Sequence, residues 1–398
     1  MIFMAKIKFE FNQDFSISHQ VEEKVNLLDK KIPVFAEHKE NLDKIQETLD
    51  DFADLENLIV VGNGGSITSF NAYLFNLGTQ KKVAVLNTPD PNYISQLKEN
   101  FAEDDTLVMA ISKSGETLET FSCLMPFIDY SVVGVTSQNN NALHQLCKKK
   151  DFPVIEHANI GGRFSAFTAS ALAPAMFCEM DANTLQKSAQ QAYSNYAPSK
   201  SIDKNDALKL ASYFYGLEQK GFTEIFCPIY SYNLSGFLPL VRQLVHETYG
   251  KNGIGQSLHG DIAPESQHHT NQRIFGGRKN LILWPFVVEK HPEELKVEIP
   301  KEIFDIKLRD MPLSNLQNKS YTKLMQYFYL GVKNTAKENK IPFVVSDFED
   351  ISTESIAEFT AFLHYFAYYS ALLRNANPFD QPAVERSKEL TFSFLNKK

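Results

Sequence analysis

Three hydroxyls and one lysine fall within six residues of one short segment, which reads SKSGET from Ser112 to Thr117. An apolar run ending at Ile111 precedes the segment, and a helix is predicted to begin near Thr117. At such a strand-to-helix turn, hydroxyls and free backbone N–H groups can together surround a phosphate. An N-capping box with Ser112 or Ser114 as the cap is the alternative. Because a cap uses one hydroxyl and this loop offers three, we favour a phosphate loop that includes Lys113.

A glycine-rich turn lies earlier in the chain, at residues 62–66, with the sequence GNGGS. It follows the apolar run 58–61 and precedes a predicted helix. Glycines such as Gly65 allow a tight turn and close approach of a ligand to the backbone, so this turn can bind an anion beside Ser66. A turn without any ligand is an equally good interpretation. Because the spacing is not G-x-G-x-x-G, we do not expect a dinucleotide-binding fold.

One carboxylate, Glu247, stands in the last turn of a helix predicted over residues 234–249, which Gly250 ends. An acidic side chain there opposes the helix dipole, a placement that costs stability but suits a general base. An exposed Glu247 paired with Lys251 is the simpler interpretation, and the local sequence alone favours it.

An arginine and a group of histidines are further candidates. Arg163 stands in the glycine turn GGRFS, where it could hold an oxyanion or simply belong to a loop. The polar segment 259–277 reads HGDIAPESQHHTNQRIFGG. Metal binding by His259, His268 and His269 is one interpretation, but no H-x3-H pair occurs, so we expect no metal.

The elements that must position these residues alternate between short apolar runs and helical patterns. The first series of predicted strands covers 58–61, 83–86, 106–111, 131–135 and 152–155. A second series covers 224–230, 281–288 and 342–345, with helices over 234–249 and 356–373 and a last helix from about residue 383. Strands that are apolar on both faces and alternate with helices predict parallel sheets covered on both sides. We therefore expect an α/β protein with two doubly wound parallel-sheet domains, each a three-layer αβα sandwich.

Three segments make up the expected domain organisation. Residues 1–34 are predicted as strand and loop. Residues 35–195 form the first domain, which opens with a helix over 35–52 and closes with one over 167–180. A polar stretch at 193–205 is the expected linker, and residues 206–398 form the second domain with the C-terminal helix.

Composition restricts the class of protein further. The 398 residues carry a formal net charge of −8, which argues against nucleic-acid binding by a broad basic face. Four widely spaced cysteines form no CxxC pair, so we expect neither a disulfide scaffold nor a zinc cluster, and a reducing cytoplasm fits best. The N-terminus lacks a signal-peptide pattern, and no apolar run approaches the ~20 residues of a membrane helix.

Six segments together resemble the glucose-6-phosphate isomerase family, whose domains are sugar isomerase (SIS) modules, and they occur in the family's order. They are GGS at 64–66, SKSGETLET at 112–120, GGRFS at 161–165, HETYGK at 246–251, SQHHTNQR at 266–273 and DQPAVERSK at 380–388.

The resemblance implies roles for individual residues. Glu247 matches the base that moves a proton between sugar carbons C1 and C2, and Arg163 matches the arginine that stabilises the enediolate. His268 matches the histidine that opens the sugar ring, and Lys388 the lysine that works with it, although a lone helical lysine would by itself be read as solvated. The remaining matches are the phosphate loop (Ser112, Lys113, Ser114 and Thr117), Gly65 and Ser66 of the glycine turn, Gln267 beside the histidine, and Glu119 near the substrate.

Two departures from the family pattern stand in the loops. Long family members have a threonine-rich phosphate loop where this chain has Gly115 and Glu116. Because a carboxylate beside a phosphate is unfavourable, we expect Glu116 to face solvent or to cap the helix. Position 63 is Asn rather than an apolar residue.

The implied activity is aldose–ketose isomerisation of glucose 6-phosphate and fructose 6-phosphate, in glycolysis and gluconeogenesis. It needs no cofactor, and the implied assembly is a homodimer whose histidine reaches the neighbouring active site. An isomerase that also accepts mannose 6-phosphate is one alternative. A non-catalytic sugar-phosphate sensor is the other, although it would need only the phosphate loop and not Glu247, His268 and Lys388 as well.

Overall fold

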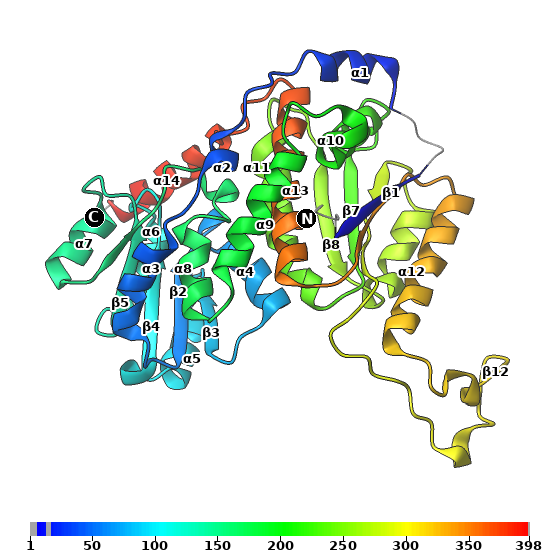
Figure 1. Ribbon diagram of the computed structural model, residues 1–398, viewed down its shortest axis with the longest axis horizontal. Helices are drawn as coiled ribbons and strands as arrows, with labels where there is room; N and C mark the ends of the chain where they lie inside the picture. Colours follow the sequence, from blue (N-terminus) through cyan, green and yellow to red (C-terminus); the bar gives the residue numbers. More distant parts are fainter. Residues whose placement is uncertain (1–5, 13–16, 397–398) are drawn as a thin grey trace.

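The computed structural model describes residues 6–12 and 17–396, which form two parallel β-sheets with helices on both faces of each (Figure 1). The first sheet has the strand order β3-β2-β4-β5-β6, and every pairing in it is parallel. Its strands are β2 (Asn57–Gly62), β3 (Lys82–Leu86), β4 (Thr106–Ile111), β5 (Ser131–Thr136) and β6 (Val154–Glu156).

Alternating residues of β2 show how the first sheet is covered. Leu58 and Val60 pack in one cluster with α3 (Leu42–Leu49), α4 (Gly65–Leu77) and α8 (Ala169–Phe177). Ile59 and Val61 point to the other face and pack with α5 (Pro91–Asn100), α6 (Leu118–Leu124) and α7 (Ala142–Lys150). Both faces of the strand are therefore buried, which explains its unbroken apolar run.

The second sheet has the order β1-β13-β10-β7-β8, with β9 also paired to β7. Its strands are β1 (Ile7–Phe11), β7 (Glu224–Ile229), β8 (Ser257–Ile262), β9 (Leu281–Leu283), β10 (Phe286–Val288) and β13 (Val344–Phe348). All pairings are parallel except that of β1 with β13. The predicted class, α/β with doubly wound parallel sheets, is confirmed, with one antiparallel edge strand added by the N-terminal segment.

Helix α13 (Thr353–Leu373) lies between the two sheets and is buried along most of its length. It contacts α9 (Ala182–Asn195), α10 (Asp206–Glu218) and α11 (Leu238–Tyr249). One apolar cluster includes residues of β2 and of β7, so the two sheets share a continuous core. α12 (Tyr321–Glu338) covers the opposite face of the second sheet.

Several expected elements differ in the structure. The N-terminal segment contains a helix, α1 (His19–Asn26), that we did not predict. The expected helix over 35–52 is broken into α2 (Val34–Glu37), α3 and a short 3-10 turn. The expected strand 281–288 is two strands, β9 and β10. β8, α10 and α12 were not predicted. β8 was missed because its sequence is polar and the strand is exposed over much of its length.

The expected linker is a packed connection rather than a loose one. α9 continues to Asn195, and the side chain of Asn205 donates to the carbonyl oxygens of Tyr196 and Ala197. Tyr196, Ala197 and Asn205 are all buried. None of the described helices is both long enough and apolar enough to span a membrane.

Candidate active site

The centre of the site is a contact between Arg163 and Glu247, two residues that the sequence separates by 84 positions. Nη1 of Arg163 lies 3.2 Å from a carboxylate oxygen of Glu247 and 2.9 Å from the side-chain oxygen of Gln381. Nη2 donates to the carbonyl oxygens of Pro378 and Asp380. Arg163 is buried, and desolvation lowers the pKa of its guanidinium while Glu247 opposes that shift. The expected pairing of Glu247 with Lys251 is wrong.

Lys251 instead holds the segment that carries Gln381. Its ammonium group donates to the carbonyl oxygens of Asn377 and Asp380 and lies 2.7 Å from the Asp380 carboxylate. The motif around Glu247 therefore contributes both a carboxylate and a cation that fixes the neighbouring loop.

A glutamine one helical turn before Glu247 orients the carboxylate. The side-chain amide of Gln243 donates to Glu247 at 3.2 Å, while its oxygen accepts from the hydroxyl of Thr68 at 2.9 Å. Gln243 is on α11, and Thr68 is in the first turns of α4. The i, i+4 spacing of Gln243 and Glu247 on one helix face was the available sequence signal, and we did not use it.

The glycine turn presses against the turn that carries Arg163. A Cβ added to Gly65 would lie 2.0 Å from the carbonyl carbon of Gly162 and 2.5 Å from the backbone nitrogen of Arg163. Only glycine allows these two backbones to approach so closely. Gly65 therefore positions Arg163 through the backbone, and Ser66 follows it at the start of α4.

The predicted phosphate loop leaves the sheet beside the glycine turn, because Gly62 at the end of β2 is paired with Ile111 at the end of β4. The hydroxyls of Ser112 and Thr117 are 3.0 Å apart, and Ser112 accepts from the backbone N–H of Gly115. Thr117 is the N-cap of α6, but its side chain makes no capping hydrogen bond. The loop is thus braced by its own hydroxyls.

Both departures in this loop have a structural explanation. Gly115 has φ +63°, and an added Cβ would lie 1.7 Å from the side-chain oxygen of Asn141, so glycine fits where threonine would not. Glu116 and Glu119 are exposed, so the carboxylate of Glu116 faces solvent as expected.

A cavity of about 970 Å³ opens beside Glu247. It is lined by the end of α11, by residues 250–257 and by the segment from Asp380 to Val384. His246 faces this region with Nε2 accepting from the backbone N–H of Leu258, and burial lowers the pKa of its imidazole. The cavity is wide enough for a small phosphorylated ligand.

His268 and Gln267 lie at the other end of the second sheet from Glu247. Glu247 is near the start of β8, where His246 contacts Leu258, whereas His268 ends a short turn that follows the strand. Six residues of strand span about 17 Å. Gln267 donates to the hydroxyl of Tyr230 at 2.8 Å, and His268 is exposed. Within one chain the structure does not bring His268 to Glu247.

Lys388 is also outside the Arg163–Glu247 contact. It lies on α14 (Glu385–Leu395), where its ammonium group is 2.9 Å from the carboxylate of Glu385. No residue of α14 is buried. Within one chain, the expected pair of His268 and Lys388 is therefore not formed.

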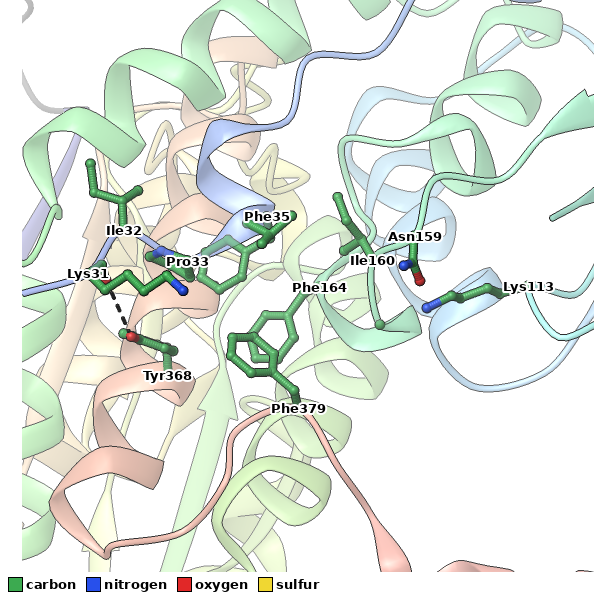
Figure 2. Close-up of a pocket in the computed structure, with 12 residues that line it drawn as sticks. Lys31, Ile32, Pro33, Phe35, Lys113, Asn159, Ile160, Phe164, Tyr368 and Phe379 are labelled. Atoms are coloured by element: carbon green, nitrogen blue, oxygen red, sulfur yellow. Dashed lines mark hydrogen bonds between the residues drawn. The ribbon is translucent and has the colours of Figure 1, made fainter. Parts of the chain in front are cut away.

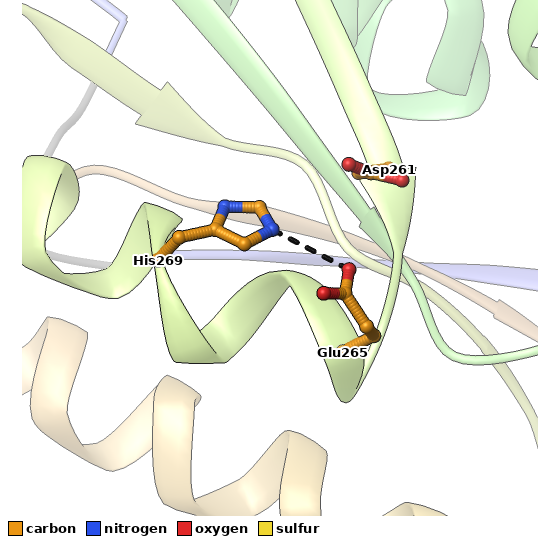
Figure 3. A group of neighbouring side chains, drawn as sticks. All are labelled: Asp261, Glu265 and His269. Carbon is orange, nitrogen blue, oxygen red and sulfur yellow. Dashed lines mark hydrogen bonds and ion pairs between the residues drawn. The ribbon is translucent and has the colours of Figure 1, made fainter.

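Three exposed side chains near the end of β8 could in principle ligate a cation. They are Asp261, Glu265 and His269, whose ligand atoms lie within 4.8 Å of one another (Figure 3). His269 Nε2 is 3.4 Å from Glu265. Exposed acidic groups of this kind are common without an ion. This group also lies at the end of the second sheet that is far from Glu247. His259 and His268 do not join it.

Gln243 and Gln381 are the site residues that the sequence analysis missed. Both place a side-chain amide against the Arg163–Glu247 pair. The arrangement offers a carboxylate for proton transfer, a guanidinium for a negative oxygen, and a hydroxyl loop for a phosphate at the adjoining strand ends. These parts stand on two doubly wound parallel sheets, as the predicted fold requires.

Comparison with known proteins makes the resemblance specific. The chain is 27% identical over 390 residues to the glucose-6-phosphate isomerase of Acholeplasma laidlawii, covering 90% of this chain and 88% of the relative. It is 29% identical over 384 residues to that of Mycoplasmopsis pulmonis, covering 91% and 88%. The chain is thus similar to glucose-6-phosphate isomerases over nine-tenths of its length, which confirms the resemblance expected from the motifs.

A solved structure agrees at the level of the fold. The crystal structure of a glucose-6-phosphate isomerase from Chlamydia trachomatis matches with a TM-score of 0.75 at 18% identity, covering 94% of this chain and 78% of that one. No model of a known protein family matches the chain.

Proposed function

We propose that this protein interconverts glucose 6-phosphate and fructose 6-phosphate. The observation that carries the proposal is the 3.2 Å contact of Arg163 with Glu247, which a chain of short contacts links to the predicted phosphate loop. Gly65 touches the turn of Arg163, and the glycine turn leaves the sheet beside the loop. The similarity to proteins named glucose-6-phosphate isomerase, over about nine-tenths of this chain, supports the same activity.

In this proposal Glu247 is the base that carries the proton between C1 and C2. Gln243 holds one carboxylate oxygen of Glu247 and Arg163 the other, so the carboxylate is oriented before substrate arrives. The guanidinium of Arg163 stabilises negative charge on the oxygen of the enediolate. Hydroxyls of Ser112, Ser114 and Thr117, with Lys113 and Ser66, hold the phosphate, and that binding orients the reacting carbons.

Ring opening is assigned to His268 and Lys388. Because His268 lies far from Glu247 in the same chain, we propose a homodimer in which the partner subunit's His268 completes each site. Glu119 and Gln267 would support the substrate and the histidine. We also propose a cytoplasmic location, because all four cysteines are free and buried.

The test is a coupled assay of the purified protein with fructose 6-phosphate, run with and without a chelator and beside mannose 6-phosphate. We expect turnover of fructose 6-phosphate that the chelator leaves unchanged. Conversion of mannose 6-phosphate at a similar rate would show the broader isomerase. Binding of sugar phosphate without any turnover would contradict the proposal and favour a sensor.

A further inference from the structure

A second cavity, of about 310 Å³, lies beside the turn that carries Arg163 but is lined by neither Arg163 nor Glu247. Aromatic rings form much of its wall, as Figure 2 shows. Phe164 stacks on Phe35 with ring centres 4.8 Å apart and meets Phe379 edge-on at 5.7 Å. Tyr368 also lines the cavity, and its hydroxyl donates to the backbone oxygen of Lys31. Of the residues that line this aromatic cavity, the proposed isomerase reaction uses Lys113 alone.

Two lysines reach this cavity from different parts of the chain. Lys31 comes from the N-terminal segment and Lys113 from the predicted phosphate loop, and Figure 2 shows their ammonium groups pointing toward the rings from two sides. Neither ammonium group makes a hydrogen bond or ion pair with any residue in the described part of the chain. Lys113 is half-buried, and this burial lowers the pKa of its ammonium group.

We propose that this cavity is a second binding site, for a small aromatic anion. Its ring would pack against Phe164 and Phe379, and its negative group would lie between Lys31 and Lys113. A volume near 300 Å³ accommodates one or two fused rings, and aromatic walls with few polar groups are typical of small-molecule sites. The two unpaired ammonium groups select a negative charge over a neutral ring.

Binding here has a consequence for the neighbouring site, and this step rests on the proposed function. Lys113 is shared between the cavity and the phosphate loop. An anion that neutralises Lys113 from the cavity weakens the attraction of the loop for a phosphate and brings a like charge near it. The aromatic anion therefore lowers the affinity for phosphate without entering the cavity beside Glu247.

The experiment is a calorimetric titration of the full chain with 2-naphthoate, an aromatic anion without a phosphate. We compare Lys31→Gln with Lys30→Gln, because Lys30 is the adjacent lysine, is exposed and does not line the cavity. We expect Lys31→Gln to weaken binding about fivefold, Lys30→Gln to leave it within twofold, and Lys31→Arg to restore it. Equal affinities of the two glutamine variants overturn the proposal, as does absence of binding to the unaltered protein.

A second titration, with inorganic phosphate, tests the coupling. We expect Lys31→Gln to leave phosphate affinity unchanged without naphthoate, and saturating naphthoate to lower it severalfold in the unaltered protein. Phosphate affinity that naphthoate does not change overturns the coupling. Both titrations measure binding alone, so an inactive protein would contradict the isomerase proposal without affecting this test.

Discussion

Arg163 is 3% exposed, and acceptors from two other segments of the chain surround its guanidinium group. They come from Glu247, from Gln381 and from two carbonyl oxygens just before Gln381. A buried cation costs free energy unless it is paired and hydrogen-bonded, so these contacts keep Arg163 in place before any ligand binds. Its position is therefore part of the folded structure rather than a response to substrate.

Gly65 is the residue on which this placement depends most directly. Replacing it by alanine puts a methyl group into the backbone of Gly162 and Arg163, so we expect Gly65→Ala to lower the free energy of unfolding by about 2–3 kcal/mol and to reduce turnover. The measurement is urea denaturation together with the isomerase assay.

Gly161→Ala is the matched control, because Gly161 has φ −62° and open space where the Cβ would lie. It should change stability by no more than about 0.5 kcal/mol. Equal stability of the two variants would contradict this prediction, because it would show that the backbone near Gly65 shifts without any loss of stability.

At the scale of the element, the sequence predicted buried strands well and exposed strands and helices poorly. β4 has the predicted bounds, Thr106 and Ile111, because a strand buried on both faces is apolar at nearly every position. β8 and α12 were missed because their exposed faces break the apolar pattern. The antiparallel pairing of β1 with β13 joins residues more than 300 positions apart, which no local pattern reports.

The residues of the candidate site also differ in how well the sequence could predict them. Residues within a motif, such as Ser112 and Thr117, could be assigned from their spacing. Gln243 and Gln381 could not, because their role depends on three segments meeting at Arg163. Motif order alone pointed to His268 and Lys388, and it could not show that one chain keeps them apart from Glu247.

Helix α13 carries a buried carboxylate, Glu358, that fastens β1 to the core. Glu358 accepts from the backbone N–H of Lys6 at 2.9 Å and lies 3.4 Å from the hydroxyl of Tyr196. Burial raises the pKa of Glu358 to about 7. Because the folded state holds this proton more tightly than the unfolded chain, the group's contribution to stability is lost as the pH rises from about 4.5 through 7.

We expect Glu358→Gln to remove this loss. Relative to the unaltered protein, its free energy of unfolding should gain on the order of 3 kcal/mol between pH 5 and pH 8, measured by urea denaturation at both pH values. Glu354→Gln, at an exposed position in the first turn of α13, is the control and should show no such gain. A Glu358→Gln variant whose advantage is the same at both pH values would contradict the burial argument.

At the scale of the whole molecule, the formal charge of −8 does not conflict with a dianionic substrate. The predicted phosphate loop relies on hydroxyls and backbone N–H groups rather than on a broad basic surface. The larger question is assembly, because each chain presents Glu247 and His268 at opposite ends of its second sheet.

Mixing two inactive variants tests the shared site. Glu247→Gln and His268→Ala should each lose activity, and an equimolar mixture allowed to exchange subunits should recover about a quarter of normal turnover, because half of the dimers contain one intact site. Each variant incubated alone is the control. A mixture as inactive as its components, although subunits have exchanged, would show that His268 acts within its own chain or not at all.

The most direct test of the central claim follows the proton that Glu247 is proposed to move. The protein is incubated with fructose 6-phosphate in D2O, and deuterium at C1 of the ketose and C2 of the aldose is measured by NMR. We predict incorporation by the unaltered protein, and for Glu247→Gln a loss of at least about 10²-fold with sugar-phosphate binding retained. Deuterium incorporation by Glu247→Gln at a near-normal rate would contradict the account.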